Sequence, residues 1–209
     1  MPYEFSLKFI QSSFLADCVT LYVLNPGAAR NIIRRSPYQR ESAMYFYQPS
    51  QGHGLPHDPL NAIVGPRPIG WISSCDQAGQ LNLAPYSFFN CFNYRPPIVG
   101  FSSNGWKDSV RNIVETKEFV WNLATRDLAE AMNQTSATLP HDQDEFTFSG
   151  LTPAASKLVS APRVAESPVN FECRLSQCIQ LTGADGTPVD TWLVLGEVVG
   201  IHIAETLLE

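Results

Sequence analysis

Residues 67–109 constrain the fold most strongly, because apolar runs of strand length alternate there with short polar breaks. The runs are too short for ordinary helices and are rich in β-branched and aromatic residues, which favours strands. Residues 76–79 separate two of these runs, and Gly79 can take the positive φ that a hairpin turn needs. This part of the chain predicts antiparallel strands at 69–74, 81–89 and 98–102, and a short strand is expected just before it at 63–64.

The C-terminal third continues the β pattern. Residues 171–181 alternate with period two, and 192–203 form a long apolar run in which Gly196 and Gly200 would let a barrel strand bend. Residues 184–186 predict the turn between them. The alternation puts Phe171, Cys173, Leu175 and Gln177 on one face and Glu172, Arg174, Ser176 and Cys178 on the other. With a further strand at 119–124, the pattern predicts a closed β-barrel.

Short helices are expected between the strands. Asp108 or Ser109 caps a helix that runs to about Thr116, and Thr125 caps a second one over 126–135. Thr152 followed by proline predicts a third helix at 153–159. Residues 134–144 are polar and predict a loop. Since no GxGxxG motif follows a strand, a Rossmann dinucleotide domain is disfavoured.

Residues 1–43 differ from the rest of the chain. They lack a clear period and gather Arg30, Arg34, Arg35 and Arg40 into a basic cluster. Strand-like patterning begins at Met44. We therefore expect an N-terminal extension of uncertain structure at 1–43 and one folded domain at 44–209, which is long enough for a sizeable core.

Composition excludes several functional classes. A net charge of -6 gives no electrostatic footprint for nucleic acid, so no such partner is expected. No apolar run reaches the roughly 20 residues that span a bilayer, and no secretory signal is clear, so no membrane partner is expected either. Five cysteines without a CxxC pair favour reduced structural thiols, which fits a cytoplasmic protein.

Lys107, Asp108 and Ser109 stand at the start of a predicted helix, directly after a predicted strand. Helix N-terminal amides, a lysine charge and a hydroxyl together suit an anion such as a phosphate. Taken alone, the same three residues are better explained as an ordinary capping turn with a solvated lysine.

Residues 82–90 read Asn-Leu-Ala-Pro-Tyr-Ser-Phe-Phe-Asn. Small or polar residues lie there among bulky aromatic ones, an arrangement that suits a flat ring with a polar edge. Backbone amides would donate to such a ring, and Asn or Ser side chains would complete the polar edge. The alternative is a core strand with a bulge at Pro85.

Four ordered blocks carry a resemblance to a known family. They read RPIGWISS at 67–74, NLAPYSFFN at 82–90, RPPIVGF at 95–101 and KDS at 107–109. Together they resemble the flavin reductase-like, FMN-binding split-barrel family, and most of all its branch of flavoredoxins and two-component monooxygenase reductases. EFVWNLA at 118–124 and GEVVG at 196–200 extend the resemblance over about 44–203. Residues 1–43 match nothing in it.

The resemblance implies a mainly β fold, a six-stranded antiparallel split β-barrel with a few short helices. It also implies non-covalent FMN, with FAD less favoured, and a homodimer with the flavin near the subunit interface. Against the phosphate and ribityl chain it places Ser73, Ser74, Ser102, Ser103, Lys107 and Ser109. Beside the ring it places Asn82, Ala84, Pro85, Tyr86, Ser87, Phe88 and Asn90.

The implied activity is NAD(P)H-dependent reduction of FMN, in which hydride moves from the nicotinamide C4 to flavin N5. That step requires no proton-transfer side chain, and no catalytic residue is assigned. Reduced flavin would pass to a partner monooxygenase or another redox protein. Two alternatives stay open: a flavoredoxin-like electron carrier that holds FMN tightly, and a non-enzymatic FMN-binding protein.

The histidines do not predict a metal site. His53 and His57 are four residues apart, but Gly54 and Pro56 between them disfavour the helix that would give this spacing a meaning. His202 lies on the last predicted strand, where it is either near the nicotinamide or structural, and the structural reading is favoured.

Overall fold

The structure, a computed structural model, describes residues 44–140 and 143–208. The chain forms two compact units, Met1–His53 and Gly54–Glu209. In the first unit, the described residues include a turn of 3-10 helix, η1 (Pro49–Gln51). The expected extension at 1–43 and its basic cluster lie outside the described residues, so the division at Met44 stays a prediction.

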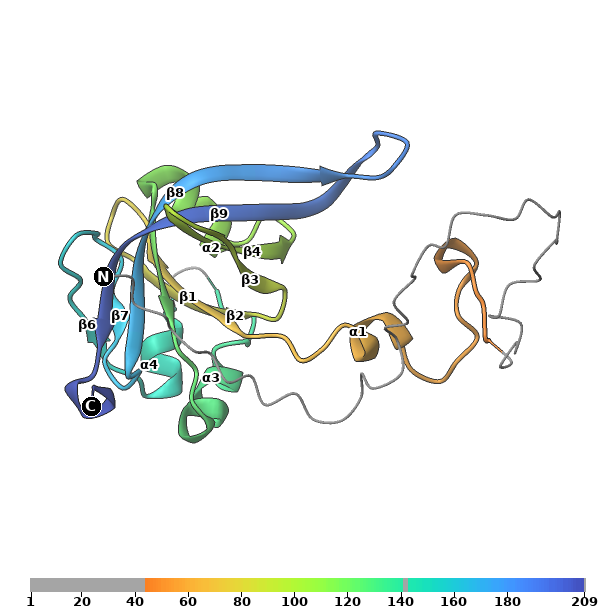
Figure 1. The fold of residues 1–209 in the computed structure, drawn as a ribbon. Coiled ribbons are helices and arrows are strands. Elements are labelled where there is room, and N and C mark those ends of the chain that lie inside the picture. Colours follow the sequence, from red (N-terminus) through yellow and green to blue (C-terminus); the bar gives the residue numbers. More distant parts are fainter. Residues whose placement is uncertain (1–43, 141–142, 209) are drawn as a thin grey trace, which may run out of the picture. The chain divides into compact units, whose positions relative to one another are not determined.

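The second unit is built on an antiparallel sheet that has, within the described residues, seven strands in the order β2-β1-β5-β8-β9-β4-β3 (Figure 1). The two outermost strands follow each other in sequence with only Ser87 and Phe88 between them. One bent strand thus supplies both edges, and counting it once gives the six strands expected of a split barrel. The bounds are β1 (Gly70–Cys75), β2 (Leu81–Tyr86), β3 (Phe89–Tyr94), β4 (Pro97–Asn104), β5 (Glu118–Asn122), β8 (Val169–Thr182) and β9 (Pro188–Ile203).

Side chains from all of these strands fill the barrel interior. The Phe101 ring lies 4.4 Å from the Tyr86 ring and 6.0 Å from the Phe119 ring, measured between centroids. Phe89 stacks on Trp121 at 5.5 Å. Buried aromatic rings remove much apolar surface from water, so this cluster contributes a large share of the stability.

Glycine allows β9 to curve over the core. A Cβ at Gly196 would lie 2.3 Å from a ring carbon of Phe119, so a side chain there would displace the aromatic cluster. Closer to the end of β9, its register against β8 shifts between Val198 and Gly200. The predicted irregularity of this strand is therefore confirmed at Gly200, while Gly196 is required by the close approach of Phe119.

The predicted alternation along β8 holds only as far as Leu175. The register against β9 shifts between Leu175 and Gln177, which leaves Ser176 as an extra residue. Beyond this bulge the faces exchange, so Cys178 packs on the core and Gln177 is exposed. The assignment of these two residues from strict period-two alternation was wrong for that reason.

Several predicted helices are present. The one expected to end near Thr116 is α2 (Asp108–Thr116), although its N-cap is Lys107 and no side chain closes the cap. Thr125 precedes η2 (Arg126–Leu128), which continues into α3 (Ala129–Gln134). The other short helices are α1 (Pro59–Ile63), α4 (Glu145–Ser149) and η3 (Glu205–Leu207).

Two element predictions were wrong. The strand expected at 63–64 falls at the end of α1, because Asp58 caps that helix by accepting from the Leu60 amide. The helix expected at 153–159 is absent from these described residues. Instead, β6 (Pro153–Ala154) pairs with β7 (Arg163–Val164), and the Thr152 amide donates to Glu166.

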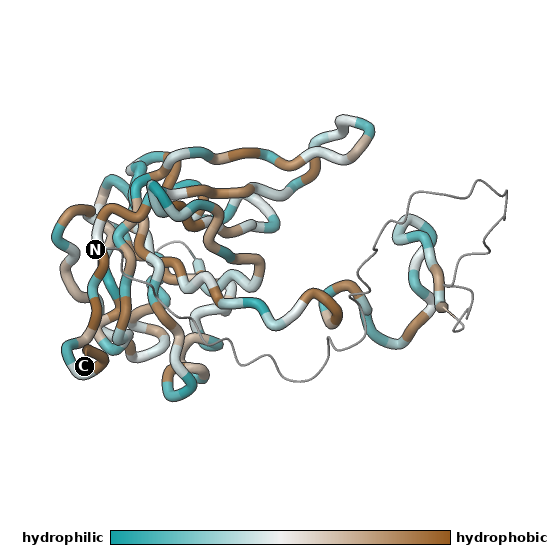
Figure 2. Tube along the Cα trace, in the orientation of Figure 1, coloured by the Kyte–Doolittle hydropathy of each residue, from teal (hydrophilic) through white to brown (hydrophobic). Residues whose placement is uncertain are grey.

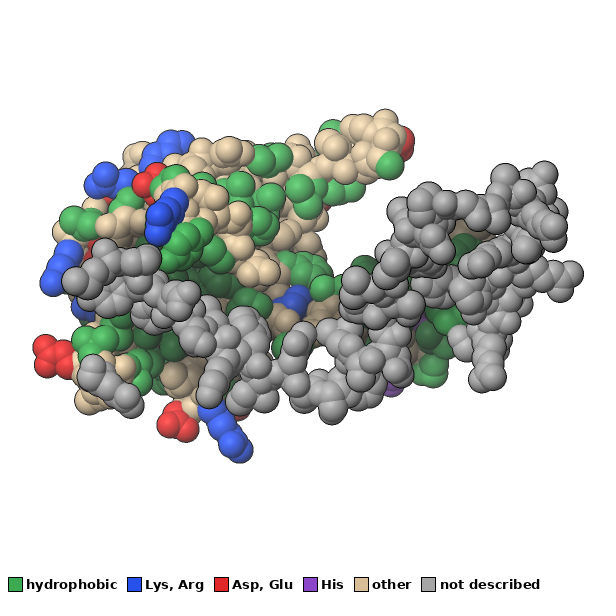
Figure 3. Space-filling view, in the orientation of Figure 1, with side chains coloured by type: hydrophobic (Ala, Val, Ile, Leu, Met, Phe, Trp, Pro, Cys, Tyr) green, Lys and Arg blue, Asp and Glu red, His purple; other side chains and the backbone are tan. Residues whose placement is uncertain are grey.

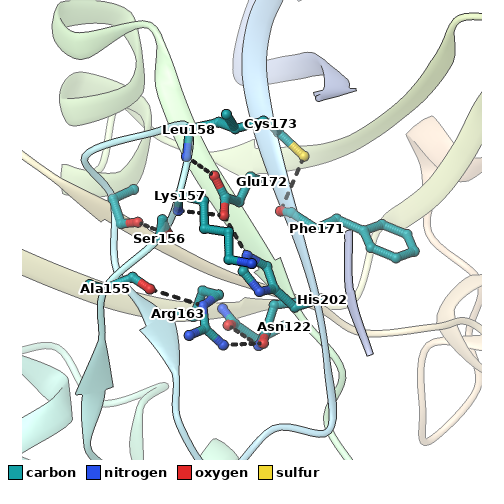
Figure 4. A network of polar contacts seen from close by, with 12 residues as sticks. Asn122, Ala155, Ser156, Lys157, Leu158, Arg163, Phe171, Glu172, Cys173 and His202 are labelled. Atoms are coloured by element: carbon teal, nitrogen blue, oxygen red, sulfur yellow. Dashed lines mark hydrogen bonds and ion pairs between the residues drawn. The ribbon is translucent and has the colours of Figure 1, made fainter. Parts of the chain in front are cut away.

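Glu172 fixes the chain at Lys157 and Leu158 (Figure 4). Its side chain is fully buried, and its carboxylate accepts from the amides of Lys157 at 2.8 Å and Leu158 at 2.6 Å. His202 Nε2 lies 2.5 Å from the same carboxylate. These contacts hold the segment in an irregular path in place of the predicted helix, and they give His202 the structural role that was favoured for it.

Candidate functional site

A cavity of about 360 Å³ lies between β2, the start of α2, residues 135–139 and the start of α4. Part of the predicted site meets here. The predicted residues that line the cavity are Asn82, Ala84, Pro85, Tyr86, Lys107 and Ser109.

The start of α2 forms one wall. Lys107 is exposed and extended at the N-cap, and Asp108 and Ser109 belong to the first turn. Amides of a first helical turn have no acceptor within the helix, and the helix dipole adds partial positive charge there. With the Lys107 ammonium, this wall suits an anion, although the Asp108 carboxylate, 3.0 Å from Arg111, lines it as well.

A second wall is β2, which is tied to α2 through buried polar groups. The Asn82 side-chain amide donates to the Ser109 hydroxyl at 2.8 Å and to the Ser74 hydroxyl at 3.3 Å. Each of these three residues is buried. The bonds hold the first turn of α2 in a fixed position relative to β1 and β2.

Tyr86 adds an unpaired hydroxyl to this wall. The residue is 7% exposed, and among the described residues its hydroxyl has no hydrogen-bond partner. Burial raises the pKa of the phenol, while the neighbouring Ser109 and Ser103 hydroxyls lower it in part. Buried polar groups are nearly always paired in folded proteins, so this hydroxyl has capacity for a further hydrogen bond, either with the Ser109 or Ser103 hydroxyl or with a bound group.

Residues 135–139 and Glu145 form the remaining wall, and sequence reasoning assigned neither to the site. The Thr135 hydroxyl accepts from the Trp71 indole at 3.0 Å, which fixes the start of the segment. Ser136 and Thr138 add hydroxyls to the lining. The run Thr-Ser-Ala-Thr at 135–138 was the available signal, since small hydroxyl residues are common at phosphate sites, but it was interpreted only as a polar loop.

Backbone amides of β2 are less available to a ring than the sequence led us to expect. The Leu83 amide donates to Glu145 Oε2 at 2.9 Å. Amides alternate between the two edges of a strand, so position 85 faces the same edge as Leu83, and Pro85 has no N–H. Backbone donors for a ring would therefore come from the bend at Ser87 and Phe88.

Three predicted serines point to protein partners. The Ser73 hydroxyl donates to the Pro162 carbonyl at 2.5 Å and accepts from Asn122 at 3.1 Å. The Ser103 hydroxyl donates to the Gly105 carbonyl at 3.0 Å. Ser74 accepts from Asn82, as described above. All three serines are buried and lie outside the cavity lining.

The other predicted residues outside the lining lie around the bend between β2 and β3. Ser87 and Phe88 are exposed, and the Arg67 guanidinium lies 5.2 Å from the centre of the Phe88 ring. Asn90 is exposed on β3, where its side-chain oxygen accepts from the Cys91 amide at 2.8 Å. Ser102 is half-buried on β4.

The donor set of the cavity fits a phosphate group of the kind a flavin nucleotide carries. Phosphate oxygens take hydrogen bonds from cationic side chains, hydroxyls and helix N-terminal amides. The cavity presents Lys107, Ser109 and the first turn of α2, with the unpaired Tyr86 hydroxyl beside them.

In the described part of the chain, no cluster of three or more His, Cys, Asp or Glu residues is arranged for a metal, and none of the helices is long and apolar enough to cross a membrane.

Residues 65–209 match the family described as flavin reductase like domain. The chain belongs to this family. Its antiparallel sheet with the bent β2–β3 strand is accordingly a split barrel, the domain named for the solved flavin reductase of Shewanella frigidimarina, which is 27% identical with a TM-score of 0.65.

Two solved structures and one further sequence illustrate the relationship. Nitrilotriacetate monooxygenase component B from Bacillus cereus is 33% identical with a TM-score of 0.70, covering 80% of this chain and 85% of that one. The 2-nitrobenzoate 2-nitroreductase NbaA of Pseudomonas fluorescens is 29% identical with a TM-score of 0.65, covering 72% of each chain. A protein of Aquifex aeolicus is 40% identical over 152 residues, which are 70% of this chain and 74% of that protein.

Proposed function

We propose that the chain is an NAD(P)H-dependent flavin reductase that binds FMN at the cavity beside α2. One observation carries the proposal. A cavity in a flavin reductase-like domain joins a lysine, a helix N-terminus and an unpaired buried hydroxyl. Bound flavin supplies the acceptor for the nicotinamide hydride, so the chain's own residues need only bind and orient the two partners. Because the flavin itself accepts the hydride, this proposal assigns no catalytic side chain.

In this proposal the predicted residues have three kinds of role. Lys107, Ser109 and the α2 amides hold the phosphate, with Tyr86 beside them. Ala84, Pro85 and the bend at Ser87 and Phe88 border the rest of the flavin, with Ser102 and Asn90 on the neighbouring strands. The remaining predicted residues, Ser73, Ser74, Asn82 and Ser103, support the site through their buried hydrogen bonds.

We also propose that the protein works as a homodimer. In Figure 1 the β8–β9 hairpin projects past the neighbouring strands, and Figure 3 shows hydrophobic side chains, in green, along it. Figure 2 shows the same hairpin with hydrophobic positions among polar ones. Its exposed apolar residues include Ile179, Leu181 and Val189. Exposed apolar side chains on a projecting hairpin favour burial against another surface, here a second copy.

A partner oxygenase would take the reduced flavin. The Bacillus cereus relative is named as component B of a monooxygenase, which supports a partner of that class. The same fold also occurs in a flavoredoxin of Desulfovibrio vulgaris, at 22% identity and a TM-score of 0.61. A flavoredoxin-like electron carrier is the alternative function, and flavin binding without turnover would distinguish it.

Visible absorption of the purified full-length chain, followed by a fluorescence titration with FMN, tests the flavin proposal. We expect saturable quenching of flavin fluorescence, with riboflavin binding more weakly because it lacks the phosphate. FMN that stays bound through gel filtration, with no NAD(P)H turnover, would favour the electron carrier. Absence of any FMN binding would overturn both functions.

A further inference from the structure

Glu145 is a buried carboxylate in the wall of the proposed phosphate site. It opens α4, is 9% exposed and lines the same cavity as Lys107 and Ser109. Its Oε2 accepts from the Leu83 amide at 2.9 Å, which fixes the carboxylate at the outer edge of β2. The group is thus positioned rigidly beside the place proposed for an anion.

The charges around this carboxylate do not favour a second anion. From α2, Lys107 and Asp108 line the cavity, and from β2 the neutral phenol of Tyr86 does so. Asp144, at the N-cap of α4, is the next titratable group and holds the Thr147 amide. Residues 135–139 contribute no charge. A phosphate in this cavity would therefore meet one lysine and two carboxylates in the described lining. The two carboxylates and the phosphate carry like charges, which repel one another.

We propose that Glu145 takes up a proton when a phosphate monoester binds in this cavity. The inference rests on the proposed function, since FMN is the phosphate monoester expected there. The step is a protonation only: the carboxylate accepts H⁺ from solvent and becomes the neutral acid, and no bond of the ligand changes.

Protonation changes what Glu145 can do. One oxygen continues to accept from Leu83, while the protonated form removes a negative charge and gains an O–H donor. Such a donor can pair with a phosphate oxygen or with another acceptor in the lining. Burial raises the pKa of Glu145, hydrogen bonds from the Leu83 and Glu145 amides lower it in part, and the Asp108 and Asp144 charges add to the rise.

Isothermal titration calorimetry measures the proton uptake directly. FMN is titrated into the full-length protein between about pH 6 and 9 in buffers of different ionisation enthalpy, whose slopes give the protons bound per flavin. In wild type we expect uptake approaching one proton at the pH of maximum effect. Where uptake is complete, FMN affinity should fall by about tenfold per pH unit as pH rises.

Three controls separate Glu145 from other sources of protons. Glu145→Gln keeps an acceptor for Leu83 and should lose the uptake and flatten the pH dependence. Glu115→Gln, on the exposed face of α2, should leave both as in wild type. Riboflavin, without the phosphate, should bind with no uptake that depends on Glu145.

The outcomes are distinguishable. Equal proton uptake in wild type and Glu145→Gln, with FMN binding intact, would overturn this inference and leave the flavin function standing. Failure of wild type to bind FMN would overturn both. Should Glu145→Gln not fold, infrared difference spectra of wild type labelled with ¹³C-glutamate provide the test. FMN should then produce a glutamic acid carbonyl band, and its absence would overturn the inference.

Discussion

Lys107 and Ser73 were both expected to contact the phosphate, and their surroundings separate them. Lys107 is exposed at the N-cap of α2 and lines the cavity, whereas the Ser73 hydroxyl is buried against Pro162 and Asn122. Residue type alone does not distinguish these cases, because a hydroxyl serves a ligand or a backbone carbonyl equally well. What decides is whether the protein already satisfies the group.

Lys107→Ala should weaken FMN binding by about ten- to hundredfold, since a hydrogen bond to a charged group contributes about 1.5–3 kcal/mol. Riboflavin affinity should change little, because the lysine is assigned to the phosphate. Lys157→Ala, an exposed lysine outside the cavity lining, is the matched control. Fluorescence titration of each variant with both flavins checks this, and an equal loss for FMN and riboflavin would contradict the phosphate assignment.

Tyr86→Phe should have opposite effects on stability and on binding. Without ligand, removing a buried unpaired hydroxyl should raise the free energy of unfolding, by up to about 1 kcal/mol. With FMN, the variant should bind less tightly, because the hydroxyl is expected to pair with the ligand. Thermal melts with and without FMN measure both quantities, and a variant with unchanged FMN affinity would show that the hydroxyl does not serve the site.

At the scale of elements, Glu172 shows how one side chain sets the path of a segment. Glu172→Gln should lower the free energy of unfolding by about 2 kcal/mol, since a charged acceptor shared by two amides and His202 is replaced by a neutral one. Urea unfolding at neutral pH measures the loss. Glu115→Gln, on the exposed face of α2, is the control, and an equal change in both would contradict this role.

The same carboxylate gives stability a defined pH dependence. Hydrogen bonds from His202 and from the Lys157 and Leu158 amides lower the pKa of Glu172 despite its burial. A lowered folded-state pKa contributes stability above the ordinary pKa, and this is lost as pH falls through the lowered value. Below about pH 5, the free energy of unfolding should therefore fall more steeply with decreasing pH in wild type than in Glu172→Gln. Equal slopes in the two proteins would contradict this.

The sequence predicted most strands because each one carries its own signal. The 76–79 turn and the apolar runs at 69–74 and 98–102 are local patterns, and the observed β1, β2 and β4 follow them. The prediction of a helix at 153–159 was wrong because the groups that bind its backbone amides are distant in sequence. The carboxylates of Glu172 and Glu166 accept hydrogen bonds from amides of that region, 14 or 15 residues away. The bulge at Ser176 likewise depends on pairing with β9.

The cavity was predictable in part for the same reason. Lys107 and Ser109 follow a strand and open a helix, a local pattern that places them at one wall. Residues 135–139 and Glu145 reach the cavity only through the packing of α3 and α4 beside β2, which no local pattern reveals. Tyr86 was expected near a flavin ring, but its unpaired hydroxyl became evident only from its burial.

At the scale of the whole molecule, the proposed homodimer should depend on the β8–β9 hairpin. Replacing Ile179 and Leu181 together by Asp should convert dimer to monomer, because charges cannot be buried there without partners. Leu207→Asp, an exposed apolar position on η3, is the matched control. Sedimentation velocity measures the state of each protein. A wild-type monomer, or a dimer unaffected by the double substitution, would contradict this interface.

Steady-state oxidation of NADH and NADPH by the purified full-length chain, measured as a function of added FMN, is the most direct test of the proposed reductase function. We predict that at least one nicotinamide is oxidised at a rate that rises and saturates with FMN, and that Lys107→Ala shifts the half-saturating FMN concentration upward. FMN-independent background rates with both nicotinamides, in protein shown to bind FMN, would contradict the reductase function.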